Sequence, residues 1–446
     1  MNYPIIHLGG ETCVTGSCHL LQVQGLNILV DCGITQGNDR CRARSDWPVK
    51  ASEIDFIFLT HAHVDHIGML PSLIKDGFAG EIICSHPTKA IIAPMLNDAM
   101  RFSDVPQGSR EGIQRRIDEQ SWGFEYGQTF DLKKGVAFTL GRAGHILGSC
   151  FIRFECRREG FSVIFSGDLG NRDTPVLPDP DRAEPADLLI LESTYGDRRH
   201  ADRSQRLGQL ALILDRSLAD GGKVFIPAFA LGRTQEILYD LDRIFTLPEY
   251  KKHYPNLNGA DHPPVFVDTP LGLEITAIYS SLAEYWDQEA RDLLVTGDHP
   301  LDFGRLFAVE KHYQHDQLLD VKGPAIIIAG SGMCTGGRIV DHLAAGIADP
   351  KNDIVLVGYM AEGTPGRQIQ DAAEKGGRVL LDGAWHAVRA GVHVLSGYSA
   401  HADQQGLLDW VGAMAQAPGR IKLVHGAQGA RAALAAKLAE RGCAVV

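Results

Sequence analysis

Apolar residues come in short runs through the first 60 positions of the chain, separated by turns that contain glycine. Runs of this length, rich in isoleucine, leucine, valine and phenylalanine, are typical of buried β-strands. They lie at residues 5–8, 19–23, 27–31 and 56–59. After the last run, apolar residues recur at helical spacing as far as Gly77. The pattern therefore predicts a buried strand that leads directly into a helix.

A different pattern occupies residues 201–380, where strand-like runs alternate with stretches of helical periodicity. The strand-like runs lie at 223–227, 265–268, 325–329 and 354–358, and the helical stretches at 204–219, 233–244 and 271–285. Alternation of this kind predicts a parallel α/β unit. The polar stretches 250–264 and 287–323 are expected to be surface excursions. Strand-like runs return at 392–396 and 421–424.

Four ligand-type side chains fall within six residues where the strand at 56–59 becomes a helix. They are His61, His63, Asp65 and His66. Alternate side chains of an extended segment point the same way, so His61 and His63 can converge on one ion. The turn into the helix presents Asp65 and His66 to a neighbouring point. Burying these groups without a cation would be costly, so the spacing predicts metal binding, with zinc favoured over manganese or iron.

Two later turns carry a potential ligand between glycines. His145 lies between Gly144 and Gly148, and Asp168 lies between two glycines at the end of the run 162–166. A carboxylate in that setting can approach a metal without steric crowding and can bridge two ions. Each turn, taken alone, is equally compatible with ordinary turn chemistry.

In this order, residues 60–68, His145 and Asp168 resemble the H-x-H-x-D-H and later ligand motifs of the metallo-β-lactamase superfamily of hydrolases. The resemblance implies an αββα sandwich with a dinuclear metal site at one sheet edge. Asp31, at the end of its strand-like run, resembles the superfamily's early aspartate. Both a capped turn and a role behind the ligands remain open for Asp31.

Glu192 ends the apolar run 187–191 and precedes Ser-Thr-Tyr-Gly, which looks like the first motif of the β-CASP branch of that superfamily. That branch contains RNA-processing nucleases and, in some members, DNA-repair nucleases. His401 in Ser-Ala-His-Ala-Asp and His425 in Val-His-Gly resemble the two remaining histidine motifs. The resemblance implies that His425 is a metal ligand and that His401 is a catalytic histidine near the scissile phosphate. Glu192 is the candidate to hold His401 in place.

Two loops of the α/β unit join a strand to a helix, where backbone N–H groups favour anions. The first, residues 227–236, has Arg233 at the start of the helix. The second, residues 330–338, resembles the G-M-x-x-G-G-R loop of β-CASP proteins and does not match a P-loop, since no lysine follows its glycines. The residues expected to bind RNA phosphates are Arg233, Ser331, Thr335, Gly336, Gly337 and Arg338.

These features predict an α/β protein, an αββα metallo-β-lactamase sandwich with an inserted parallel α/β β-CASP domain. The sandwich is expected to comprise residues 1–200 and 381–446, and the insert residues 201–380. Two Zn²⁺ ions per chain, with Mn²⁺ as an alternative, would be bound by His61, His63 and His145 at one site and by Asp65, His66 and His425 at the other, with Asp168 bridging.

The expected activity is cleavage of single-stranded RNA between the two domains by metal-activated hydroxide. Asp65, Glu192 and His401 are the predicted catalytic residues. A small-ester or thioester hydrolase of the glyoxalase or lactonase class is one alternative, although a small substrate does not need a second domain. A non-catalytic RNA-binding scaffold is the other, although all seven ligand positions are filled.

Composition adds few constraints to the predicted fold and activity. The formal net charge of −12 argues against a broad nucleic-acid-coating surface but not against a local basic groove. Nine cysteines without a C-x-x-C pair are typical of reduced thiols. No apolar stretch is long enough to span a membrane, and residues 1–4 show no secretory signal. A cytoplasmic protein is expected, and its oligomeric state, a homodimer included, is left open.

Overall fold

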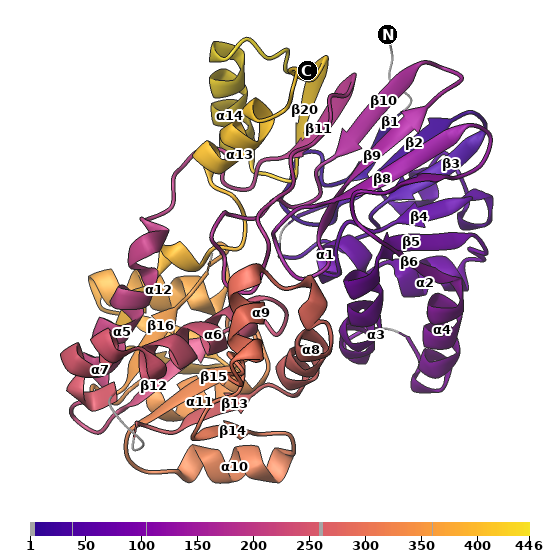
Figure 1. The fold of residues 1–446 in the computed structure, drawn as a ribbon. Helices are drawn as coiled ribbons and strands as arrows, with labels where there is room; N and C mark the ends of the chain where they lie inside the picture. Colours follow the sequence, from indigo (N-terminus) through magenta and orange to yellow (C-terminus); the bar gives the residue numbers. More distant parts are fainter. Residues whose placement is uncertain (1–4, 38, 104, 258–261, 359) are drawn as a thin grey trace. The chain divides into compact units, whose positions relative to one another are not determined.

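The computed structural model describes residues 5–37, 39–103, 105–257, 262–358 and 360–446. Residues 1–4, for which no secretory signal was predicted, lie outside the described residues. The chain divides into two compact units (Figure 1). The first combines Met1–Arg199 with His401–Val446, and the second is His200–Ala400. Among the helices that the structure describes, none has both the length and the apolar character of a membrane-spanning segment.

The first unit contains two six-stranded sheets. One has the order β1-β2-β3-β4-β5-β6, antiparallel from β1 to β3 and parallel from β3 to β6. Its strands are β1 (Ile5–Gly9), β2 (Cys18–Val23), β3 (Leu26–Val30), β4 (Phe56–Phe58), β5 (Glu81–Ser85) and β6 (Ser121–Phe124). The other has the order β20-β11-β10-β9-β8-β7. Its strands are β7 (Thr129–Asp131), β8 (Val136–Arg142), β9 (Cys150–Cys156), β10 (Phe161–Phe165), β11 (Leu188–Glu192) and β20 (Arg420–Val424).

The two sheets of the first unit pack face to face through one apolar core. Alternate residues of each strand point into it, and the ring of Phe58 contacts those of Phe138 and Phe154 edge-on, with centroids 4.9 and 4.8 Å apart. Burying one such phenylalanine stabilises the fold by about 1.5–3 kcal/mol. The core therefore fixes the strands whose ends carry the polar loops.

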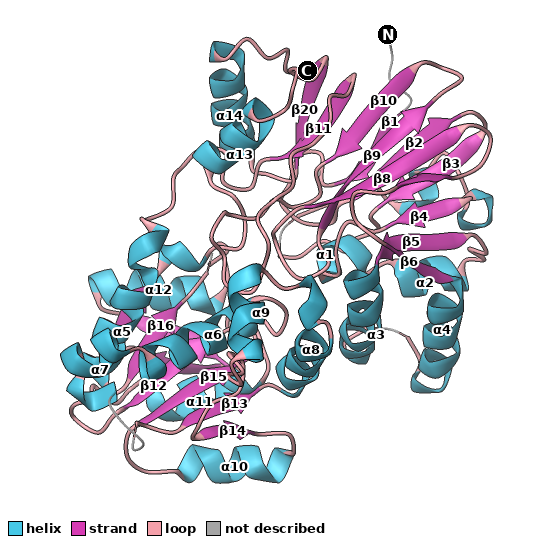
Figure 2. Cartoon of the chain, in the orientation of Figure 1, coloured by secondary structure: helices cyan, strands magenta, loops and turns pink. Residues whose placement is uncertain are grey.

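Helices cover the outer faces of both sheets, which makes the first unit an αββα sandwich (Figure 2). Leu407 and Leu434, from the two C-terminal helices, are buried against the outer face of β11 and β20. The helices are α1 (Val64–Ile67), α2 (Leu70–Lys75), α3 (His86–Arg101), α4 (Gln107–Gln120), α13 (Gln404–Gly412) and α14 (Gln428–Glu440).

The second unit is built on a six-stranded, fully parallel sheet with the order β14-β13-β15-β12-β16-β19. Its strands are β12 (Lys223–Pro227), β13 (Val265–Asp268), β14 (Leu306–Ala308), β15 (Ala325–Ala329), β16 (Asp353–Leu356) and β19 (Gly391–Val394). The helices are α5 (Arg206–Ser217), α6 (Arg233–Thr246), α7 (Pro248–His253), α8 (Pro270–Ser281), α9 (Gln288–Val295), α10 (His312–Asp320), α11 (Arg338–Gly346) and α12 (Pro365–Lys375). A hairpin, β17 (Arg378–Leu381) and β18 (Ala384–Ala387), completes it.

Two features differ from expectation. The second unit extends to Ala400 rather than to residue 380, because β19 pairs with β16 and adds residues 391–394 to its sheet. The stretch 287–323, expected to be a surface excursion, contains α9, β14 and α10. A three-residue edge strand and short helices with few buried residues leave only a weak apolar pattern.

Candidate metal centre

The loop between β4 and α1 brings four potential ligands to one end of the first unit. His63 is the residue before α1 and has extended backbone angles, with φ −66° and ψ 148°, so His61 and His63 precede the helix and Asp65 and His66 lie in its first turn. The turn after β3 packs directly on this loop. A Cβ at Gly33 would lie 1.5 Å from the carbonyl oxygen of Asp65, so only glycine fits there.

The first group of facing atoms comes from His61, His63, His145 and Asp168, whose ligand atoms all lie within 4.8 Å of one another. Nδ1 of His63 is 3.0 Å from Nε2 of His61 and 3.2 Å from Nε2 of His145. Oδ2 of Asp168 is 3.6 Å from Nε2 of His61 and 3.7 Å from Nε2 of His145. Ligands on a tetrahedral zinc with bonds near 2.0–2.1 Å lie about 3.3 Å apart, so this spacing suits a transition metal.

The second group is Asp65, His66 and His425. Nε2 of His66 lies 3.9 Å from Oδ2 of Asp65 and 3.4 Å from Oδ2 of Asp168, while Nε2 of His425 lies 3.5 Å from Oδ1 of Asp168. Asp168 thus lies between the two groups: its Oδ2 faces both the first group and His66 of the second, and its Oδ1 faces His425. The structure brings together all seven residues that the sequence analysis assigned as ligands.

Buried polar atoms in this cluster test whether the residues suit a cation. Nε2 of His66 and Oδ1 of Asp168 are buried and form no hydrogen bond within the described part of the chain, although they contact Oδ2 of Asp168 at 3.4 Å and Nε2 of His425 at 3.5 Å. Leaving such an atom unsatisfied costs about 1–3 kcal/mol, and a divalent ion would satisfy both. Five imidazoles and two carboxylates are also the ligand types that zinc and manganese take. The residues therefore fit a divalent metal centre.

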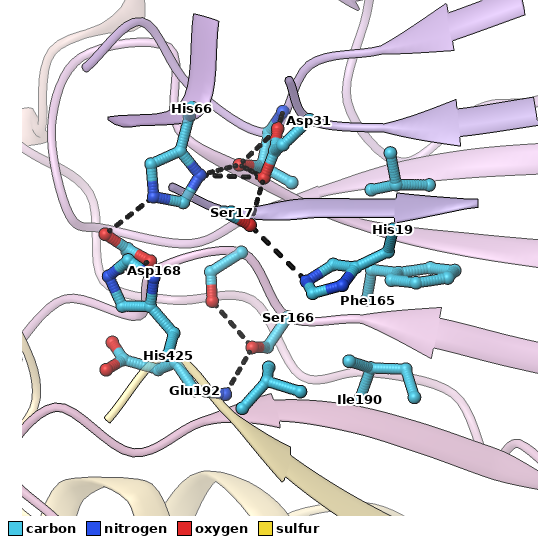
Figure 3. Close-up of a pocket in the computed structure, with 14 residues that line it drawn as sticks. Ser17, His19, Asp31, His66, Phe165, Ser166, Asp168, Ile190, Glu192 and His425 are labelled. Carbon is cyan, nitrogen blue, oxygen red and sulfur yellow. Dashed lines mark hydrogen bonds and ion pairs between the residues drawn. The ribbon is translucent and has the colours of Figure 1, made fainter. Parts of the chain in front are cut away.

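Asp31 orients His66 from behind (Figure 3). Nδ1 of His66 lies 2.7 Å from Oδ2 of Asp31, and Asp31 also accepts hydrogen bonds from the backbone N–H of Thr60 at 2.8 Å and from Oγ of Ser17 at 3.2 Å. This arrangement assigns the His66 proton to Nδ1 and leaves the lone pair of Nε2 facing Asp168. Of the two roles left open for Asp31, the contacts favour support of a ligand.

The charges of the cluster favour a cation in its centre. Burial lowers the pKa of His61 well below its ordinary value and the pKa of His63 to about 4, so both imidazoles are neutral, as metal ligands must be. Burial also opposes charge on His66, but Asp168 and Asp31 outweigh it and raise its pKa well above the ordinary value. A positive charge, a proton or a metal, is therefore stabilised at His66.

The backbone at two of these positions is itself unusual. Asp31 has φ 58° and His425 has φ 49°, in the left-handed region that residues other than glycine rarely adopt. The backbone N–H of His425 donates to the carbonyl oxygen of Gly10 at 2.6 Å, which holds the conformation. Strained backbone of this kind is concentrated at functional sites.

Glu192 and His401 meet beside the cluster. Nδ1 of His401 is 3.2 Å from Oε1 of Glu192 and 3.9 Å from Oδ2 of Asp168. Glu192 also accepts from the backbone N–H of Leu169 at 2.8 Å and of Thr194 at 3.1 Å. Burial lowers the pKa of His401, but Glu192 and then Asp168 outweigh burial and raise it to about 9.

The residues expected to bind RNA phosphates all belong to the second unit, and both arginines among them contact groups of the protein. Arg233 is only 7% exposed and forms an ion pair with Glu236. The Arg338 guanidinium donates from Nη1 to Oδ1 of Asp268 and to the carbonyl oxygen of Val309, both at 2.7 Å. These contacts engage part of each guanidinium with groups of the protein, and phosphate binding by Arg233 and Arg338 stays a prediction. Surface positions remain for Ser331, Thr335, Gly336 and Gly337.

The second unit contains a buried polar cluster that was not predicted. Oδ2 of Asp268 lies 2.6 Å from Nδ1 of His315 and 2.7 Å from Nε2 of His342. These residue types could hold a metal ion, but the distances are those of hydrogen bonds and are shorter than the about 3.3 Å between ligands of a tetrahedral zinc. The cluster is better explained as a hydrogen-bonded anchor for Arg338. No sequence motif marks it.

The αββα sandwich and a cluster of imidazoles and carboxylates at the ends of its strands define a metallo-β-lactamase-fold hydrolase. Three family models match the chain: "Metallo-beta-lactamase superfamily" at residues 12–210, "Beta-Casp domain" at 234–369 and "Zn-dependent metallo-hydrolase RNA specificity domain" at 385–446. The chain belongs to the β-CASP family of metallo-β-lactamase-fold proteins, as its relatives also show. The predicted family and fold class are confirmed, and the family binds divalent metal.

Two curated relatives match along nearly the whole chain. Ribonuclease TTHA0252 of Thermus thermophilus is 36% identical over 438 residues, which are 98% of this chain and 96% of that protein. Transcription termination factor FttA of Methanocaldococcus jannaschii is 30% identical over 94% of this chain, which spans 66% of that protein's length. A solved structure of a protein of unknown function from Enterococcus faecalis shares the fold, with a TM-score of 0.54, 12% identity and coverage of 95% of this chain and 93% of that one.

Proposed function

We propose that this protein is a metal-dependent ribonuclease that hydrolyses phosphodiester bonds of single-stranded RNA. The observation that carries the proposal is the arrangement of seven ligand-type residues in two groups that share Asp168, with the Glu192–His401 pair beside them. The name of the Thermus thermophilus relative and the description of the family model at residues 385–446 support RNA as the substrate. The first unit would carry the chemistry and the second would contact RNA.

Two divalent ions, zinc foremost and manganese as the alternative, would occupy the centre. His61, His63 and His145 would hold one, Asp65, His66 and His425 the other, and Asp168 both. When bound, such a pair supplies a nucleophile from water near neutral pH and neutralises charge on the phosphate oxygens. Asp65 carries a carboxylate that is only 17% exposed and faces the same space, where it can also accept a proton.

His401 is the proposed proton donor to the leaving oxygen. Phosphodiester cleavage expels an alkoxide, which is a poor leaving group near neutral pH unless it is protonated or bound to metal. Nδ1 of His401 faces Glu192, and we assign proton donation to Nε2, on the other side of the ring. Glu192 acts through His401 as a positioning residue, since its own oxygens are occupied by two backbone N–H groups and the imidazole.

The proposal is tested with purified protein and a fluorescent single-stranded RNA, before and after removal of metal by a chelator. Cleavage that is lost on chelation and restored by zinc or manganese supports it. A matched single-stranded DNA and a thioester of the kind that glyoxalases hydrolyse are the comparison substrates. Turnover of the thioester without cleavage of RNA would show a small-ester or thioester hydrolase instead. Metal-independent binding of RNA without cleavage would show a non-catalytic RNA-binding scaffold.

A further inference from the structure

The loop between β12 and α6 places a different residue at the surface from the one that its sequence suggested. Arg233, at the start of α6, is buried, whereas Phe229, four residues earlier, is 40% exposed. The carbonyl oxygen of Phe229 accepts from the backbone N–H of Thr234 at 3.2 Å and from its Oγ1 at 2.8 Å. The backbone that carries this exposed ring is therefore held by the first turn of the helix.

Phe229 lies directly against the glycine-rich loop after β15. A Cβ at Gly332 would be 2.8–3.0 Å from three atoms of the Phe229 ring, so any larger residue would push the ring away. The two loops are neighbours because β12 and β15 pair in parallel and both loops leave the carboxyl ends of their strands (Figure 1). This edge is where ligands bind in open parallel α/β sheets.

Hydroxyl groups accompany the ring on the glycine-rich loop. Oγ of Ser331 lies 3.2 Å from Oγ1 of Thr335 and accepts from the backbone N–H of Thr335 at 3.0 Å, and Thr335 is exposed. Arg233 and Arg338, the arginines of these two loops, are occupied by carboxylates of the protein. This part of the surface therefore offers an aromatic ring and neutral polar groups, while both guanidiniums are already paired with carboxylates.

We infer that Phe229 is a stacking platform for one nucleobase of single-stranded RNA. The base covers the exposed face of the ring, and the sugar–phosphate backbone passes the hydroxyls of Ser331 and Thr335. Every base has a π-face, so such contacts suit a substrate bound with little sequence preference. The inference rests on the proposed function, since it names a binding subsite for the same substrate.

Because the proposed subsite pairs no phosphate with a cation, its loss should change RNA affinity but not the salt dependence of binding. Removing a base–aromatic stack weakens RNA binding about 5- to 150-fold without changing the salt dependence of binding. Loss of a phosphate contact would instead lower that salt dependence by about one per contact. The two kinds of contact are thus distinguishable by measuring affinity at several salt concentrations.

The experiment measures RNA affinity by fluorescence anisotropy, with His401→Ala present in every protein so that cleavage is slow. Phe229→Ala should weaken binding by the stated factor with an unchanged salt slope, Phe229→Leu should do the same, and Phe229→Tyr should bind like the parent. Phe307→Ala is the matched control, since Phe307 is 45% exposed and lies on the edge strand of the same sheet. It should change affinity less than twofold.

An RNA series with one abasic position identifies the stacked base. In the parent, one abasic position should weaken binding, and in Phe229→Ala that position should no longer matter. Normal affinity of Phe229→Ala or of Phe229→Leu overturns the inference, as does an equal loss in Phe307→Ala. Cleavage of RNA by the wild-type protein is measured alongside. If cleavage is present while these variants bind normally, only the inference fails, and if cleavage is absent the proposed function fails first.

Discussion

Replacing His401 with alanine should remove the proton donor for the leaving oxygen and leave the metal centre assembled. Nδ1 of His401 lies nearer to Glu192, at 3.2 Å, than to Asp168, at 3.9 Å, so Glu192 rather than the shared ligand is the closer of its two carboxylate partners. Its backbone is held independently, because Nδ2 of Asn171 donates to the His401 carbonyl oxygen at 2.7 Å. Asp403 then caps α13 by accepting from the backbone N–H of Gly406. The substitution should therefore affect the imidazole alone.

The expected loss in cleavage rate is roughly 10²–10⁴-fold, the usual range for general acid catalysis. At about 1.36 kcal/mol per tenfold, this is about 2.7–5.4 kcal/mol of transition-state stabilisation. Stability should fall by less, about 1–3 kcal/mol, because Glu192 loses one of three donors and keeps the backbone N–H groups of Leu169 and Thr194. Metal content and RNA affinity should not change.

The assay compares two substrates whose leaving groups differ. Rates are measured on single-stranded RNA and on an aryl phosphodiester, whose phenolate leaves without protonation, and metal content is measured by elemental analysis. The aryl ester should be hydrolysed at close to the wild-type rate. His393→Ala is the control, since it removes an imidazole that also faces a carboxylate, with Nε2 2.7 Å from Oδ1 of Asp353, but lies in the second unit.

Three outcomes would contradict a general-acid role for His401 beside an intact metal centre. A full rate on RNA would remove the general-acid role. An equal loss on both substrates would place the damage in the metal centre rather than in proton donation. Loss of metal from the His401→Ala protein would make His401 a ligand and exchange its assignment with that of His425.

Other substitutions test the metal ligands, the contacts of Arg338 and the packing of Gly33 on the metal loop. Asp168→Ala should lower occupancy of both metal sites, because its carboxylate contacts residues of both groups, whereas Asp65→Ala should mainly empty the second. Elemental analysis after dialysis separates the two, and equal losses would contradict the assignment. Arg338→Ala should lower the free energy of unfolding by about 1–3 kcal/mol, measured with denaturant, because Asp268 loses a buried partner. A reduced salt dependence of RNA binding in this variant would instead support a direct contact of Arg338 with phosphate. Gly33→Ala should cost about 1–3 kcal/mol or more and release metal, because its Cβ would meet Asp65; unchanged thermal unfolding would show that the metal loop can move aside.

The sequence predicted the fold well where burial is strong. In the second unit, β12, β13 and β15 have the predicted limits, because parallel strands buried on both faces form near-continuous apolar runs. The edge strand β14 and the helix α10 were missed, because the few apolar residues they bury make only a weak pattern. The extent of the second unit was underestimated because pairing of β19 with β16 depends on residues far apart in the chain.

The candidate site was predictable to the extent that it is local. The ligands from His61 to His66 lie within six consecutive residues, and their spacing alone indicates metal binding. Glu192 and His401 are separated by 209 residues, so only the family resemblance could pair them. Arg233 was expected to bind phosphate because its position at a helix start is visible in the sequence, whereas its burial and its ion pair with Glu236 are visible only in the fold.

The central claim is that this cluster binds two divalent ions and that RNA cleavage needs both. The most direct measurement starts from metal-free protein and follows cleavage of single-stranded RNA as zinc is added back in known amounts per chain. If the sites fill in turn, we expect little cleavage up to one equivalent of zinc per chain and full cleavage near two, with the Asp168→Ala protein inactive throughout. Full activity at one equivalent, or activity in the metal-free protein, would contradict it.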